Sequence, residues 1–62
     1  MNWTIAITQI DAQLWSVYGE LEHDQGVDHM GSNVVGDEQT AREFAANVFG
    51  ADATVTVDPL AS

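Results

Sequence analysis

The side chains best suited to hold a metal ion gather in one short segment of the chain. His23, Asp24, Asp28 and His29 lie close together in sequence, and imidazole and carboxylate groups are ligands of Zn²⁺ and similar ions. A tight turn over residues 23–26 would bring His23 toward Asp28 across a hairpin. The spacing matches no established metal motif, however, and Asp-rich turns are common in acidic proteins. We interpret the segment as a solvated turn and expect no metal site and no cofactor; a site built on His23 and His29 is the alternative.

Other arrangements that support catalysis are weak or missing. The chain has no cysteine, none of its serines lies in a G-x-S-x-G setting, and no glycine-rich phosphate loop is present. Glu20 and Glu22 have the chemistry for acid–base work, but such work needs a concave pocket. A sheet with one helix rarely encloses a pocket at this chain length. We therefore expect a protein without enzymatic activity.

Charge is the most unusual property of the composition. Ten aspartate and glutamate residues stand against one basic residue, Arg42, and the formal net charge is −9. Proteins bind the phosphates of DNA or RNA with lysine and arginine, and anionic membranes attract the same residues. We therefore expect no direct nucleic-acid binding and no membrane association. Complementary potentials instead favour a basic protein partner.

Two strands are expected in the N-terminal third of the chain. Residues 3–10 alternate between apolar and polar side chains and are rich in β-branched residues, which predicts a strand. Residues 14–22 are ambiguous, because their apolar side chains fit both a period of two and a helical stripe. Gly19 would cost a helix about 1 kcal/mol, and Trp15 and Tyr18 belong to types that prefer strands. We interpret the segment as a strand, with a helix as the alternative.

A turn and a short third strand follow. Residues 23–26 have the composition of a tight turn that ends in a glycine with positive φ. Residues 27–30 are expected to return as a short strand. Residues 31–33, Gly-Ser-Asn, are expected to interrupt that strand.

The second half of the chain predicts a helix and a final strand. Asp37 is a suitable N-cap, and Gly50 stands where a left-handed C-cap residue belongs. Glu38 and Arg42 are four residues apart in the favourable order for an ion pair. Residues 53–58 alternate again and predict a strand.

These elements predict a single small acidic α+β domain over residues 1–62, in the order β-β-β-α-β. We expect an antiparallel meander of three or four strands with one helix packed on one face. The periodicities of the strands and of the helix indicate which side chains meet between the two layers. The predicted core consists of Trp3, Ile5, Ile7, Trp15, Val17, Leu21, Val55 and Val57 from the strands, and Phe44, Val48 and Phe49 from the helix.

One helix covers one face of a sheet, so the opposite face is expected to be open. Open antiparallel faces normally carry many charges, whereas the side chains in the middle of this face are small and uncharged. The face also includes a tyrosine, a residue type that is enriched at interfaces. The carboxylates of Glu20, Glu22, Asp24 and Asp28 follow one another along the predicted second strand and its turn. A DNA mimic presents negative charges in such a row, at intervals like those of phosphates. The predicted open face consists of ten residues: Thr4, Ala6, Thr8, Ile10, Leu14, Ser16, Tyr18, Glu20, Thr54 and Thr56. The predicted partner-binding residues are Thr4, Ala6, Thr8, Tyr18, Glu20, Glu22, Asp24 and Asp28.

The small size of the domain favours association. A chain this short buries only about 60% of the surface that it exposes when unfolded, and it has no cysteine with which to form a disulfide. A partner surface would add stability, so we expect a homodimer. The lack of cysteine fits a reducing compartment, and we expect neither a signal peptide nor a membrane-spanning segment. The expected location is cytoplasmic.

No specific motif assigns the chain to a family. Its size, acidity and element order are similar to those of small phage-encoded inhibitors of nucleic-acid enzymes, and its element order is also similar to that of HicB-like antitoxin domains. Both resemblances are at the level of the fold, and function is argued from the site. The charge of −9 and the uncharged face around Tyr18 motivate the first hypothesis, a noncatalytic protein-binding module that engages a basic, nucleic-acid-binding partner and inhibits it in the manner of a DNA mimic. The alternative is a small structural or assembly subunit whose acidity reflects a high-salt environment.

Overall fold

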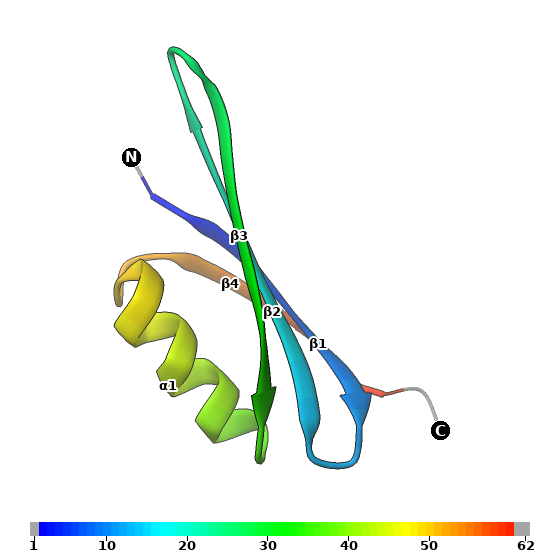
Figure 1. Ribbon diagram of the computed structural model, residues 1–62. Coiled ribbons are helices and arrows are strands. Elements are labelled where there is room, and N and C mark those ends of the chain that lie inside the picture. The colour runs from blue at the N-terminus through cyan, green and yellow to red at the C-terminus, as the bar shows by residue number, and fades with distance from the viewer. Residues whose placement is uncertain (1, 61–62) are drawn as a thin grey trace.

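The computed structural model describes residues 2–60 as one four-stranded sheet with a single helix on one face (Figure 1). The elements are β1 (Thr4–Asp11), β2 (Leu14–His23), β3 (Gly26–Val35), α1 (Glu38–Phe49) and β4 (Thr54–Asp58). The expected α+β fold and its β-β-β-α-β order are therefore confirmed. Residues 14–22 belong to a strand, which resolves the ambiguity of that segment.

The strands are ordered β3-β2-β1-β4 across the sheet. The first three form the antiparallel meander that the sequence predicts. β4 joins the other side of β1 and runs parallel to it, with Thr4 opposite Thr54, so the sheet is mixed. The parallel direction follows from the connection, because α1 carries the chain from one edge of the sheet across its face to the other edge.

The core lies between α1 and the middle of the sheet. Ile5, Ile7 and Val17 are almost completely buried, and they face the two fully buried alanines of the helix, Ala41 and Ala45. These small side chains let the helix backbone approach the sheet closely. Trp15 and Phe49 are also buried, as the sequence predicts, while Trp3, Phe44 and Val57 pack against this core with part of their surface exposed.

Three predictions about the core are wrong. Val48 and Val55 are 41% and 37% exposed, and Leu21 is half-buried but lies outside the core cluster. The helix packs on β1, β2 and β3 and not on β4, so Val55 has no helix above it. Val48 lies beside the buried side of the helix, which is formed by Ala41, Ala45 and Phe49. Leu21 lies beyond Glu20, the last residue of β2 that pairs with β1. In the other direction, Val34 is buried although its role in the core was not predicted.

Both ends of the helix lie at the predicted residues, but only the N-cap has the predicted conformation. The Asp37 side chain accepts hydrogen bonds from the backbone N–H and the hydroxyl of Thr40, each at 2.9 Å. The Glu38 carboxylate pairs with Arg42 at 2.8 Å. Gly50 ends the helix with a positive φ of 104°, although its ψ of 150° is extended rather than left-handed helical.

The third strand is longer than predicted. β3 covers ten residues and passes straight through Gly31, Ser32 and Asn33, where the sequence indicates a break. Each of these residues pairs with β2, so long-range pairing overrides their local preference for turns. The predicted turn is correct: His23 pairs with Gly26 across it, and Gly26 has a positive φ of 132°.

The β2–β3 hairpin extends past the rest of the sheet. β1 pairs with β2 only as far as Glu20, so the residues of the hairpin beyond Glu20 have no neighbouring strand on the β1 side. Figure 1 shows the tip of this hairpin projecting away from α1, and the described chain measures 39 Å along its longest axis and 15 Å along its shortest. Within residues 2–60, no helix is long and apolar enough to cross a membrane.

Candidate functional site

The sheet face opposite the helix is organised in rows that cross the strands. Strand pairing puts Tyr18 beside Ala6, and Ala6 beside Thr56. Paired residues lie on the same face of a sheet, so these side chains form one row. A second row contains His29, Glu20, Thr4 and Thr54, and a third contains Asn33, Ser16, Thr8 and Asp58. We call this surface the open face.

The middle of the open face is exposed and mostly uncharged, as predicted. Thr4, Ala6 and Thr8 are exposed, and Tyr18 is 38% exposed. The Glu20 carboxylate lies at the end of β2 that leads to the hairpin, and Glu22 follows two residues later on the same face. Of the ten predicted open-face residues, Leu14 and Ser16 are half-buried rather than exposed.

Tyr18, Glu20 and His29 form a polar cluster on the open face. The Tyr18 hydroxyl hydrogen-bonds with His29 Nδ1, and the two rings stack with centroids 5.9 Å apart and planes 27° apart. The Glu20 Oε1 atom lies 3.9 Å from the same His29 nitrogen. Partial desolvation of the phenol and the nearby negative charge of Glu20 raise the pKa of Tyr18 above its ordinary value. Tyr18 therefore stays protonated at neutral pH and presents an aromatic ring with a neutral polar tip.

Two glycines hold this cluster in place. Gly31 lies directly across from Tyr18, and a Cβ atom there would come within 3.3 Å of Tyr18 Cδ1. Its absence leaves space for the tyrosine ring to lie over β3 toward His29. Gly19 lies between Tyr18 and Glu20, and the Phe49 ring packs on its α-carbon from the helix side. The packing of α1 on β2 thus fixes the strand from which Tyr18 and Glu20 project.

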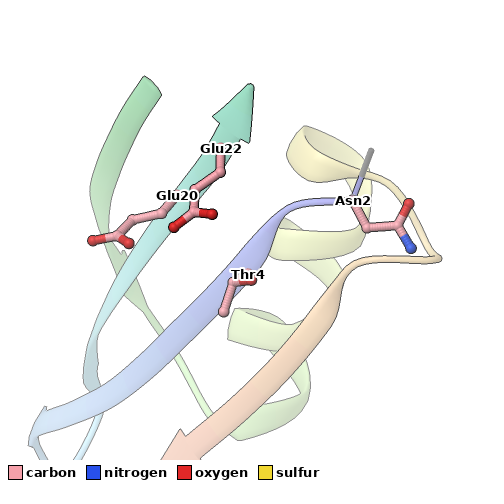
Figure 2. Close-up of a pocket in the computed structure, with 4 residues that line it drawn as sticks. All are labelled: Asn2, Thr4, Glu20 and Glu22. Carbon is pink, nitrogen blue, oxygen red and sulfur yellow. The ribbon is translucent and has the colours of Figure 1, made fainter. Parts of the chain in front are cut away.

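A shallow hollow adjoins the cluster. It is lined by Asn2, which precedes β1, by Thr4 at the start of β1, and by Glu20 and Glu22 near the end of β2 (Figure 2). Thr4 projects from β1 beside the β2 strand that carries the Glu20 and Glu22 carboxylates (Figure 2). Among residues 2–60, the side chains that line the hollow include two carboxylates and no basic group.

Two of the predicted binding residues lie elsewhere. Asp28 pairs with Leu21, and Leu21 belongs to the helix side of the sheet, so Asp28 does not share a face with Glu20. Asp24 is in the turn at the tip of the hairpin. The expected row of four carboxylates is therefore divided between two faces and a turn, and only Glu20 and Glu22 of that row belong to the open face.

The histidines also lie on opposite faces. His23 Nε2 approaches Asp28 Oδ2 to 3.3 Å on the helix side, as the hairpin geometry predicts, but the orientation of the two groups does not make a hydrogen bond. His29 projects from the open face. A metal ion bound by both His23 and His29 is therefore incompatible with the geometry. In residues 2–60, no group of three or more His, Cys, Asp or Glu side chains is placed to hold a metal.

The sequence did not identify His29 as part of this cluster. In the sequence its imidazole stands out only as a candidate metal ligand, because the short strand predicted over residues 27–30 does not define which residues of β2 lie beside it. The alternation of Val27, His29 and Gly31 along one strand would have indicated a shared face if the strand had been extended through Gly31.

The chain was compared with protein-family models, curated proteins and solved structures, and none of them shows significant similarity to it.

Proposed function

We propose that this protein is a noncatalytic acidic binding module that engages a basic surface of another protein through its open face. The observation that carries the proposal is the arrangement around Tyr18. An exposed aromatic side chain, held by His29, lies between an uncharged patch of Thr and Ala side chains and a hollow bordered by two carboxylates. Protein interfaces commonly combine an aromatic anchor with a polar or charged rim.

The charge of the whole molecule supports the same partner class. With a formal net charge of −9, the chain attracts positively charged surfaces over roughly the Debye length, about 8 Å at physiological ionic strength. The attraction raises the rate of encounter, and the open face then determines which basic surface fits. Nucleic-acid-binding proteins carry such surfaces, because they neutralise phosphates with lysine and arginine, so inhibition of one of them is a direct consequence of binding.

The geometry favours recognition of a compact basic patch over imitation of a long run of phosphates. On the open face, Glu20 and Glu22 are separated by two residues, about 6.6 Å along the strand. Asp58 is the next carboxylate on that face, and it lies at the opposite corner because it pairs with Thr8. A partner that inserts one or two lysine or arginine side chains beside Tyr18 matches this distribution.

Two double variants with the same net charge test the proposal. Glu20→Gln with Glu22→Gln neutralises the open face, whereas Glu43→Gln with Asp52→Asn neutralises one exposed carboxylate on α1 and one in the following loop. Each pair changes the formal charge by the same amount. The tagged proteins are used to capture partners from lysate of the source organism, and captured proteins are quantified by mass spectrometry at low and high salt.

The proposal predicts a basic protein that binds the wild-type chain and the α1 control pair, is released by added salt, and is lost from the open-face pair. Equal loss from both pairs would show that net charge alone governs binding, and the role of the open face would then be wrong. The structural-subunit hypothesis has a separate signature. Circular dichroism at increasing salt concentration measures whether the chain folds in dilute buffer. If folding requires molar salt, the acidity is an adaptation to a salty environment rather than a means of recognising a partner.

A further inference from the structure

The outer edge of β3 is open for backbone pairing. β3 is the terminal strand of the sheet, and in residues 2–60 no strand pairs with its outer side. Nine of its ten residues are exposed, and Val34 is the exception. The opposite edge strand, β4, is half as long and is followed directly by Pro59. Short edges and prolines protect sheets against association, and β3 has neither form of protection.

The hairpin geometry shows which backbone groups of β3 point outward. His23 and Gly26 flank a two-residue turn, and such flanking residues form a hydrogen-bonded pair. At the other end, Gly36 N donates to Gln13 O at 2.8 Å, which continues the same ladder. The even-numbered residues of β3 therefore bond to β2. The odd-numbered residues direct their N–H and C=O groups to the outer edge: Val27, His29, Gly31, Asn33 and Val35.

Most other edge-protecting features are also missing from β3, which has a single acidic residue, Asp28. The strand contains no lysine and no proline, and its pairing with β2 runs through all ten residues without a bulge. Three large apolar side chains of β3 are exposed: Val27 at 44%, Met30 at 47% and Val35 at 74%. An edge of this length and composition is a template for another strand.

We propose that β3 pairs antiparallel with β3 of a second copy of this chain, about a two-fold axis at Gly31, so that two sheets join into one. This register brings Val27 of one copy beside Val35 of the other on the open-face side, and His29 beside Asn33. On the helix side it brings Met30 beside Ser32. All the outward backbone groups from Val27 to Val35 then find partners, because odd-numbered residues meet odd-numbered residues.

The register also separates like charges. Asp28, the only acidic residue of β3, meets Val34 of the second copy. The two Asp28 residues are then six positions apart along the joined strands, about 20 Å, which exceeds the Debye length of about 8 Å. Shifting the axis to His29 would leave Val35 without a partner and bring the two aspartates closer. Length, apolar matching and charge therefore favour the axis at Gly31.

The dimer has a distinctive salt dependence. Two chains of net charge −9 repel each other, and added salt screens that repulsion while leaving backbone pairing and apolar contact intact. Self-association therefore tightens with salt, whereas binding of a basic partner weakens. The axis is perpendicular to the sheet, so both open faces lie on the same side of the dimer. The dimer does not depend on the proposed function.

Sedimentation equilibrium of the full chain at low and high salt tests the dimer, with protein concentrations up to about 1 mM. The expected mass approaches twice the chain mass of 6.7 kDa, at lower concentration when salt is raised. Val27→Asp with Val35→Asp should restore the monomer mass. Thr54→Asp with Thr56→Asp adds the same charge to exposed positions on β4 and should leave the dimer intact. Far-ultraviolet circular dichroism confirms that each variant is folded.

Cross-linking tests the register. The chain has no cysteine, so Val27→Cys and Val35→Cys each introduce a single thiol. A short bis-maleimide should join the two variants when they are mixed. Neither variant should cross-link to itself, because equivalent residues at position 27 are about 27 Å apart across the axis. A monomer at every concentration and salt, dissociation by the β4 pair as much as by the β3 pair, or self-linking of one variant would each overturn the proposed dimer.

Discussion

Replacing Gly19 with alanine tests the packing that holds the open face in position. A Cβ atom at Gly19 would lie 2.6 Å from Phe49 Cε1 and 2.8 Å from Phe49 Cζ, whereas packed carbon atoms are separated by about 3.5–4.0 Å. The ring must therefore move by about 1 Å. Phe49 is only 8% exposed and packs against Trp3, with ring centroids 4.9 Å apart, so it has little free space to enter.

The expected cost is the difference between two effects. Overpacking a well-filled core destabilises by about 1–3 kcal/mol, while replacing a strand glycine with alanine stabilises by about 0.5–1 kcal/mol. We expect Gly19→Ala to lower the free energy of unfolding by about 1 kcal/mol. In a domain of this size that change lowers the Tm by about 4–8 °C. Thermal and urea unfolding, followed by circular dichroism, measure both quantities.

Gly31→Ala provides the matched control, because it makes the same change on the neighbouring strand. There the new Cβ would meet Tyr18 Cδ1 at 3.3 Å, and Tyr18 is an exposed side chain that can shift. We expect its stability to stay within about 0.5 kcal/mol of wild type. A second test combines Gly19→Ala with Phe49→Leu, which removes the two obstructing ring atoms; the cost of Gly19→Ala should shrink in that background. Equal effects of the two glycine variants, with no coupling to Phe49, would refute the packing argument.

Three further predictions follow from individual contacts. Hydrogen bonds from Thr40 lower the pKa of Asp37 in the folded protein. The ionised Asp37 carboxylate therefore stabilises the fold above the pKa that it has in the unfolded chain, and this stabilisation is lost as pH falls through its pKa in the folded protein. Asp37→Ala should lower the Tm at neutral pH and have little effect in strong acid. Because the pKa of Tyr18 is raised, the protein should lose stability as pH rises toward that pKa, and Glu20→Gln should move the ultraviolet phenolate titration to lower pH. Trp15 Nε1 donates to Gly36 O at 2.9 Å, so Trp15→Phe should cost about 1–2 kcal/mol in urea unfolding.

The sequence predicted correctly those elements whose conformation depends on residues a few positions apart in the chain. The alternation around Ile5 and Ile7, the two-residue turn before Gly26, and the Asp37 cap depend on backbone preferences over a few positions, and all three are present in the structure. The open face followed from the same alternation, because one helix leaves one side of a sheet exposed. This is why Thr4 and Tyr18 were predicted to lie on the open face.

Features that depend on long-range pairing were not predicted. The Gly-Ser-Asn segment at residues 31–33 has the composition of a turn, yet pairing with β2 keeps it extended. That extension brings His29 beside Glu20 and moves Asp28 to the helix side. The parallel pairing of β4 and the exposure of Val55 depend on where α1 crosses the sheet, which no local pattern encodes.

The most direct test of the binding proposal is a map of the partner contact on the ¹⁵N-labelled chain. Cross-saturation from the captured basic partner should reduce the amide signals of Thr4, Tyr18 and Glu20 on the open face. The amides of Gln39 and Glu43 on α1 should keep their intensity, because they lie on the other side of the sheet. Signal loss centred on α1, with the open face unaffected, would contradict the account.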